Sequence, residues 1–225
     1  RKVSGNTSDD QLRNEEQQLS QDEEEDDGLT AQTAYLAVHD VWLNEKFAPE
    51  LLPHQADLID CMLQQIKHME ENMKGLEKND IRLLIHRMEI DRIRFVIASY
   101  LRIRLEKIEM YTVHILSQEA NRSPADCYLT PAEHKFANEF LANTETLFKN
   151  IALQHMPGNF STFEVDKLDA KPNMNAYVFL RANERITGIM ISGTDEEIDF
   201  ESQSQHIIQY SAVAELVKNN TVQLI

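Results

Sequence analysis

Arginine and carboxylate side chains are mixed along one stretch of the chain, residues 80–116, which holds six of the eleven arginines. Guanidinium groups bind carboxylates through paired hydrogen bonds, and several of these arginines stand three or four residues from an acid, as in Arg87 with Asp91 and Arg102 with Glu106. This pattern fits ion pairs within one helix, and it equally fits arginines that bind carboxylates of neighbouring helices. Direct DNA binding is disfavoured, because the interspersed acids cancel the positive field.

The sequence lacks the residue patterns on which common enzyme classes depend. It contains no glycine-rich phosphate loop, no HExxH, CxxC or GxSxG pattern and no calcium loop of the usual form. Cys61 and Cys127 lie 66 positions apart, match no metal-binding spacing, and are expected to be buried small apolar residues. We therefore expect a protein that is not an enzyme and that needs no metal or other cofactor.

The stretch that carries the arginines contains neither glycine nor proline and is predicted to form one long helix from Asp80, its N-cap, to Leu116. At a rise of ~1.5 Å per residue, such a helix is roughly 50 Å long. It needs several neighbours, more than the other helices of the chain supply, so the isolated chain is predicted to aggregate or oligomerise. Apolar residues in steps of three or four predict one buried stripe, which comprises Ile81, Leu84, Ile85, Met88, Ile93, Ile97, Tyr100, Leu101, Leu105, Ile108 and Ile115.

Three further helices are predicted before residue 157. The first begins at Thr30 and stops within residues 44–53, which contain two prolines, and the second ends at Gly75. The last begins at residues 130–133 (TPAE), a capping box with proline at the first helical position, and ends before Pro157. Four helices, mostly antiparallel, would make one domain.

The residue periodicity changes after these helices. The predicted fold class is α+β, with a helical domain at residues 29–156, a linker at 157–172 and a small β-rich domain at 173–225. About 50 residues are marginal for an independent domain, so the small domain is expected to dock on another part of the structure. Its strands are predicted at residues 177–180, 188–191, 198–200, 206–210 and 221–225, with one or two helical turns at 212–218.

The balance of charge favours protein partners over nucleic acid. The chain has a net charge of −16 with 42% hydrophobic residues, which suits a globular acidic protein. Residues 1–28 hold ten acids against three bases and are predicted to form a disordered tail, which is either a solvating segment or a docking peptide around Leu12 and Leu19. We find no signal peptide and no apolar run of membrane length, so we expect a reducing compartment and no membrane contact.

Six motifs, in the same order along the chain from about residue 30 to the C-terminus, resemble those of the Sld-five subunit family of the eukaryotic GINS complex. They are residues 44–52 (NEKFAPELL), 68–72 (HMEEN), 99–109 (SYLRIRLEKIE), 142–145 (ANTE) with 155–157 (HMP), 177–181 (YVFLR) and 222–225 (VQLI). Residues 1–28 match none of the family's motifs. The resemblance implies an all-helical A domain followed by a small β-rich B domain, in agreement with the order of elements predicted above.

The resemblance also implies a function. GINS is a heterotetramer of Sld-five with three Psf subunits, and it joins Cdc-forty-five and the MCM ring in the active replicative helicase. Because the MCM ring hydrolyses ATP, this chain would be a non-catalytic assembly subunit in the nucleus, with weak or indirect DNA contact and further replisome partners at its acidic tail. A small hydrolase and a helical scaffold whose basic patch binds nucleic acid directly remain as alternatives.

The candidate site is therefore an interface with partner proteins. Arg102 and Arg104 lie in the best-matched motif and are predicted to bind carboxylates in this chain or across an interface. Val222 and Leu224 are predicted to face the core of the small domain, with Ile225 at the sheet edge or in a neighbouring subunit. The full set of candidate interface residues is Arg92, Arg94, Tyr100, Arg102, Arg104, Leu105, Val222, Leu224 and Ile225.

Overall fold

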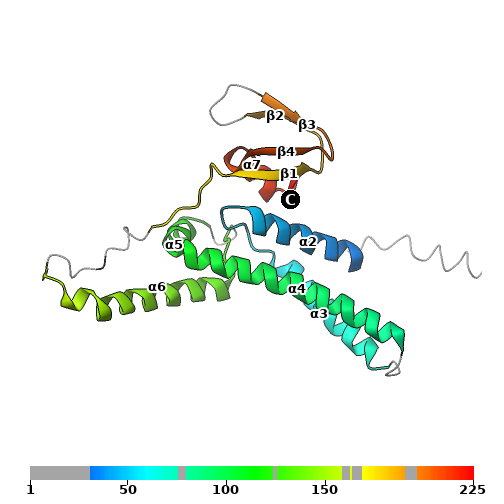
Figure 1. The fold of residues 1–225 in the computed structure, drawn as a ribbon, viewed down its shortest axis with the longest axis horizontal. Coiled ribbons are helices and arrows are strands. Elements are labelled where there is room, and N and C mark those ends of the chain that lie inside the picture. Colours follow the sequence, from blue (N-terminus) through cyan, green and yellow to red (C-terminus); the bar gives the residue numbers. More distant parts are fainter. Residues whose placement is uncertain (1–30, 76–79, 124–125, 159–162, 164–168, 191–196) are drawn as a thin grey trace, which may run out of the picture.

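The computed structural model describes residues 31–75, 80–123, 126–158, 163, 169–190 and 197–225, and it has the α+β fold predicted from the sequence (Figure 1). A helical part comes first, followed by a small part with two antiparallel sheets and one helix. The predicted acidic tail and most of the predicted linker lie outside the described residues.

The helical part is organised around its longest helix, α4. Figure 1 shows α2 along one side of α4, while α3 and α6 reach its opposite ends. Buried apolar side chains of α2, α3 and the middle of α4 form one core, and the end of α4 forms a second core with α5 and α6. The elements are α2 (Ala31–Phe47), α3 (Ala56–Met73), α4 (Ile81–Met110), α5 (Thr112–Ala120), α6 (Pro131–Ile151) and the 3-10 helix η1 (Leu153–His155).

Local sequence signals place the ends of these helices. The Asp80 carboxylate accepts a hydrogen bond from the Arg82 amide at the start of α4, at 2.9 Å. At the start of α6, Thr130 and Glu133 form the predicted capping box, with each side chain accepting from the backbone amide of the other residue. The first predicted helix stops as expected, at Phe47 before Pro49.

The prediction of one helix through to Leu116 was wrong, because α4 ends at Met110 and α5 begins at Thr112. In a continuous helix the amide of residue 112 would donate to the carbonyl of Ile108. The Thr112 hydroxyl donates to that carbonyl instead, at 2.6 Å, and Tyr111 leaves the helical conformation with φ −118° and ψ 28°. A side chain that competes for a backbone acceptor thus interrupts the helix without glycine or proline.

The small part contains the predicted strands and helical turns. Strand β1 lies between β4 and β5 in an antiparallel sheet, with Phe179 opposite Ile207 and Leu180 opposite Leu224. A separate hairpin pairs β2 with β3. The strands are β1 (Tyr177–Ala182), β2 (Ile186–Met190), β3 (Glu197–Phe200), β4 (Gln205–Gln209) and β5 (Val222–Leu224), and helix α7 (Tyr210–Lys218) precedes β5.

The two parts share one hydrophobic core. The inner face of the sheet, α7 and the β2–β3 hairpin enclose Leu180, Phe200 and Leu224, all fully buried, and Ala48 and Leu52 of the helical part belong to the same cluster. The expectation that the small domain docks on another part of the structure is therefore confirmed. It docks on the end of α2 and the segment that follows it.

Candidate interaction surfaces and the ion network behind them

Arg104 lies at the centre of a buried ion network. It is 1% exposed and uses all five N–H donors of its guanidinium within this chain. The Nε and one Nη2 donor bind the Glu133 carboxylate at 2.7 and 3.1 Å, and one Nη1 donor binds Glu45 at 3.2 Å. The remaining two donors bind the carbonyls of Leu52 and Tyr128, both at 2.8 Å. The fork of one α4 arginine thus fixes α2, the start of α6 and two loops.

A second cation, Lys107, completes the network one turn further along α4. Its ammonium donates to the Glu45 carboxylate at 2.8 Å and to the carbonyls of Glu45 and Glu50 at 2.5 and 2.8 Å. Glu45, 1% exposed, therefore bridges both cations. Burial lowers the pKa of the Lys107 ammonium, although the Glu45 carboxylate opposes this effect. Removing one member of such a network leaves a buried charge without a partner.

The network makes the stability of the chain depend on pH. Burial by itself raises the pKa of the Glu133 carboxyl. The hydrogen bonds and positive charge of Arg104, together with the hydrogen bonds from Thr130, lower this pKa by more than burial raises it. The pKa of Glu133 therefore lies below its usual value. A carboxyl whose pKa is lower in the folded state stabilises the fold when the pH is above its unfolded-state pKa. This stabilisation is lost as the pH falls through the folded-state pKa.

We therefore expect the free energy of unfolding to fall as the pH is lowered from about 5 to about 3, at up to ~1.4 kcal/mol per pH unit for this one group. Glu133→Gln should flatten this slope, and denaturant unfolding at a series of pH values measures it. Glu139→Gln, which removes an exposed carboxylate from the same helix, is the matched control and should keep the parental slope. An unchanged slope in Glu133→Gln would contradict the assignment.

Four polar contacts fix the small sheet and α7 on the helical part. The Leu224 amide donates to Asn44 at 2.8 Å, and the Gln223 side chain donates to Asp40 at 2.5 Å, so β5 lies along α2. The Tyr210 hydroxyl donates to Glu50 at 2.9 Å. Glu50 also pairs with Lys218 at 3.2 Å, at the end of α7. Both Glu45 and Glu50 lie in the motif at residues 44–52. Glu45 belongs to the ion network, whereas the Glu50 side chain holds the small domain.

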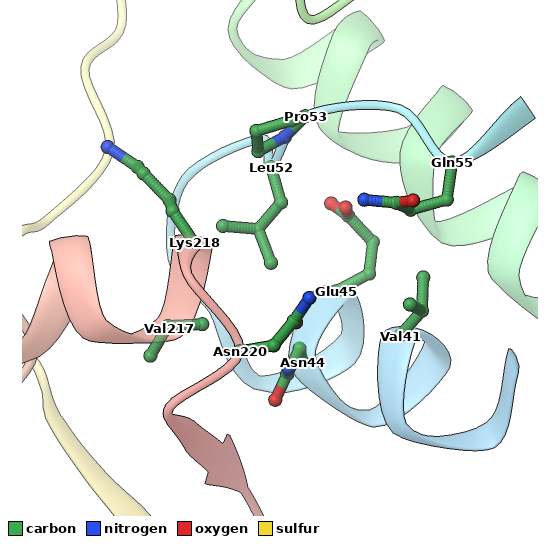
Figure 2. A pocket seen from close by; sticks show the side chains of 9 residues that line it. All are labelled: Val41, Asn44, Glu45, Leu52, Pro53, Gln55, Val217, Lys218 and Asn220. Carbon is green, nitrogen blue, oxygen red and sulfur yellow. The ribbon is translucent and has the colours of Figure 1, made fainter. Parts of the chain in front are cut away.

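A small cavity lies at this junction between α2 and the end of α7 (Figure 2). Its volume is about 20 Å³, enough for roughly one water molecule and too small for a substrate. Figure 2 shows the Glu45 and Gln55 side chains directed toward one another at its wall, with Asn44 and Asn220 near its other end. Within the described residues, no group of three or more His, Cys, Asp or Glu side chains could hold a metal ion.

The first half of α4 presents a row of apolar side chains to solvent. We name it the α4 stripe: Ile81, Leu84, Ile85, Met88 and Phe95, each more than half exposed. The sequence predicted four of these residues to be buried, and within the described residues of this chain they are not. Neighbouring α4 residues such as Ile90 and Ile93 face the core formed with α2 and α3.

A second apolar surface lies where α3, α4 and α6 meet. This groove has a volume of about 330 Å³ and an almost entirely apolar lining. Its lining includes Ile59 and Leu63 of α3, Leu101 and Leu105 of α4, and Ala132 of α6. Both leucines on α4 remain more than a third exposed, so side chains from a partner could fill the groove.

The other arginines of α4 do not form a free basic patch. Arg82 pairs with Asp80 at 2.7 Å, and Arg92 pairs with Glu89, three residues away on the same helix, at 3.4 Å. Arg94 binds Glu70 of α3, so it pairs with a neighbouring helix rather than with its own. Arg102 is exposed.

The candidate interface residues occupy three different environments. Tyr100, Arg104, Val222 and Leu224 are buried in this chain, and the prediction that Val222 and Leu224 face the small core is confirmed. Arg92, Arg94, Arg102 and Leu105 are exposed. Ile225 is half-buried beside the sheet. A role in partner binding remains a prediction for all nine residues, and Arg104 has no N–H donor left for a partner.

Sequence reasoning missed two features of these surfaces. The acids that bind Arg104 were not identified, although Glu133 was already marked by its capping box and Glu45 by its motif. The cysteine prediction was wrong for Cys61, which is exposed on the outer side of α3, and Cys127 is only half-buried. Both features depend on which distant segments pack against these residues, and local spacing does not contain that information.

Fold and surfaces together define the class, which is an α+β protein with an N-terminal helical bundle and a small docked β domain. Its described residues leave apolar helix faces uncovered. Within the described residues, no helix is both long and apolar enough to cross a membrane.

Comparison with known proteins identifies the family. The model of the GINS complex protein helical bundle domain (Sld5) matches residues 57–152, and that of the DNA replication complex GINS protein SLD5 C-terminus matches residues 172–225. DNA replication complex GINS protein SLD5 of Mus musculus and that of Homo sapiens are 46% and 45% identical over 190 residues, covering 82% of this chain and 85% of each relative. The Xenopus laevis protein is 42% identical over 209 residues, covering 90% and 95%. The chain belongs to the SLD5 family of GINS complex proteins in DNA replication.

Proposed function

We propose that this chain is a non-catalytic structural subunit of a heterotetrameric GINS complex in the nucleus. Its direct partners are the three Psf subunits, and the tetramer joins Cdc-forty-five and the MCM ring in the replicative helicase. In this proposal residues 29–156 form the assembly domain and residues 173–225 the small domain, and the acidic tail at residues 1–28 is available to other replisome proteins.

The α4 stripe is the observation that carries this proposal. Burying a large apolar side chain is worth roughly 1.5 to 3 kcal/mol, so five such residues in one row represent a large unused driving force. A monomeric soluble protein rarely leaves so many apolar side chains together on one helix. The stripe and the groove at Leu101 and Leu105 both lie on α4, which suits partner helices that pack along it.

The polar chemistry of the chain supports a structural role. The strongest concentration of buried charge, around Arg104, is saturated by protein contacts and has no group free to act on a substrate. The cavity beside Glu45 holds about one water molecule. A non-enzymatic assembly subunit accounts for both features.

Direct nucleic-acid binding is less well supported. Arg82, Arg92 and Arg94 are each neutralised by a carboxylate, and the whole chain is strongly acidic. Counterion release needs several unpaired cations on one surface. Only Arg87 and Arg102 among the α4 arginines are exposed without an ion pair in the described residues, and they lie 15 positions apart.

We expect the double variant Leu84→Asp and Met88→Asp to abolish assembly with the three Psf subunits on co-expression, because two carboxylates would be buried without partners in an apolar interface. Native mass spectrometry of the purified complex measures this. Met110→Asp, an equally exposed methionine at the other end of α4, is the matched control and should assemble normally.

The parent chain expressed alone should aggregate or self-associate, and the double variant should suppress that behaviour. A double variant that still forms a stoichiometric tetramer would overturn the assignment of the stripe. A monodisperse parental monomer with a sharp melting transition would contradict the proposed dependence on partners.

A further inference from the structure

The outer face of the small sheet carries a row of apolar side chains across all three strands. Ile207 of β4 stands opposite Phe179 of β1, and the Ile225 amide at the end of β5 donates to the Phe179 carbonyl at 3.1 Å. Tyr177 lies two residues before Phe179 and therefore on the same face. Phe179, Ile207 and Tyr177 are about 60% to 70% exposed, and a hollow of about 460 Å³ lies over the row.

This row ends at an open strand edge. The sheet order places β4 at the edge, paired only with β1. The Tyr210 amide donates to the Ala176 carbonyl across the two strands. In an antiparallel ladder every second residue bonds to the neighbouring strand, and the residues between them point their backbone groups away from it. In β4 the outward residues are Gln205, Ile207 and Gln209. As the N-cap of α7, Gln209 uses its carbonyl for the first bond of that helix. Among the described residues, no other hydrogen bond reaches the outward groups of Gln205 and Ile207 or the Gln209 amide.

Strand β4 also lacks the features that usually block an edge from pairing. Its sequence, QHIIQ, contains no proline, lysine or acidic residue, and no bulge interrupts its register with β1. A strand added there would place one side chain next to Ile207 and extend the row Ile225, Phe179, Ile207 to a fourth position. Backbone and side chains therefore favour the same occupant, an extended segment with an apolar residue on the shared face.

The net charge of the small domain favours basic flanks for that segment. Residues 173–225 contain seven acids and three bases, and of the bases Lys218 is already paired with Glu50 and Glu215. The row itself is uncharged. An incoming segment with lysine or arginine beside its apolar residue would be attracted by this domain, whereas an acidic segment would be repelled.

We propose that β4 binds an extended segment of a partner protein as an added strand, with an apolar side chain beside Ile207 and basic residues on either side of it. This surface is on the small domain, and it goes beyond the assembly role proposed for the α4 stripe. Single-stranded DNA is a poorer fit, because Arg181 is the only cation on the three strands and it lies near Asp40.

The test uses the full chain carrying Leu84→Asp and Met88→Asp, which should suppress aggregation through the α4 stripe, and a fluorescein-labelled peptide, Lys-Val-Arg-Ile-Lys-Val-Lys, as the probe. We expect saturable binding by fluorescence anisotropy. In hydrogen exchange followed by NMR, the amides of Gln205, Ile207 and Gln209 should exchange rapidly in the free chain and become protected with the peptide. The amides of His206 and Ile208, which face β1, should be protected in both states.

Two variants separate the backbone contribution from the side-chain contribution. Gln209→Pro removes one outward N–H at a residue whose φ is already −65°, the value that proline requires, and should weaken binding about tenfold. Ile207→Asp changes an exposed side chain and should weaken binding at least about tenfold. Met110→Asp, an equally exposed apolar position on α4 outside the stripe, is the matched control and should bind as the parent does.

Several results would overturn the proposal. They are the absence of saturable binding, equal binding of a peptide with N-methylated alternate amides, and displacement of the probe by oligothymidine. Self-association of the chain that Ile207→Asp abolishes would also overturn it, since the occupant would then be a second copy. The Leu84→Asp and Met88→Asp variant should retain peptide binding, so failure of this proposal is distinguishable from failure of the assembly role.

Discussion

Replacing Arg104 with methionine should lower the free energy of unfolding by about 3 to 5 kcal/mol, the loss typical of breaking a buried ion network by removing one partner. Methionine keeps much of the volume of the side chain, so the loss reports on charge and hydrogen bonds more than on packing. Glu45 and Glu133 would remain almost fully buried without their guanidinium partner, and the carbonyls of Leu52 and Tyr128 would lose their donor. Denaturant unfolding followed by circular dichroism measures the change.

Arg102→Met is the matched control for this substitution. It removes the same group two residues earlier on the same helix, from an exposed position, and should change stability by less than about 0.5 kcal/mol. Arg104→Lys should remain strongly destabilising, because an ammonium has three donors and cannot reproduce the planar fork. A stability within about 1 kcal/mol of the parent for Arg104→Met would show that the network contributes little.

Removing Leu224 and Ile225 should release the small domain from the helical part. Leu224 is fully buried, and truncating a buried leucine costs roughly 2 to 5 kcal/mol before any backbone bond is counted. The truncation also removes the Leu224 amide that binds Asn44 and the Ile225 amide that binds Phe179. Limited proteolysis should show faster cleavage within residues 173–223, while the helical signal from α2 to α6 persists.

Ile207→Ala tests whether any loss of apolar area on this sheet has the same effect. Its side chain is 61% exposed, so its removal should leave the cleavage pattern unchanged. Tyr210→Phe removes only the hydroxyl that binds Glu50 and should give a smaller effect than the truncation, about 1 to 3 kcal/mol. If the truncated chain kept the parental protease pattern, the C-terminal strand would not be what holds the small domain in place.

The sequence by itself determined the features that depend on neighbouring residues. The cap at Asp80, the capping box at Thr130 and the stop before Pro49 were readable because each acts within one helical turn. The alternation of Val222 and Leu224 likewise predicted their burial, since one strand fixes which side chains share a face. The order of a helical part and a small β part followed from the change in periodicity.

Only the tertiary structure decided which arginine is structural and which apolar residues the chain covers. Glu133 and Glu45 lie 29 and 59 positions from Arg104, separations that carry no periodic signature. The helix break at Tyr111 likewise depends on which donor reaches the Ile108 carbonyl. The apolar spacing from Ile81 to Met88 is the same as that of a buried stripe, yet these residues are exposed. Spacing reports that a face is suited to burial, whereas the segments that bury it come from elsewhere in the chain or from another molecule.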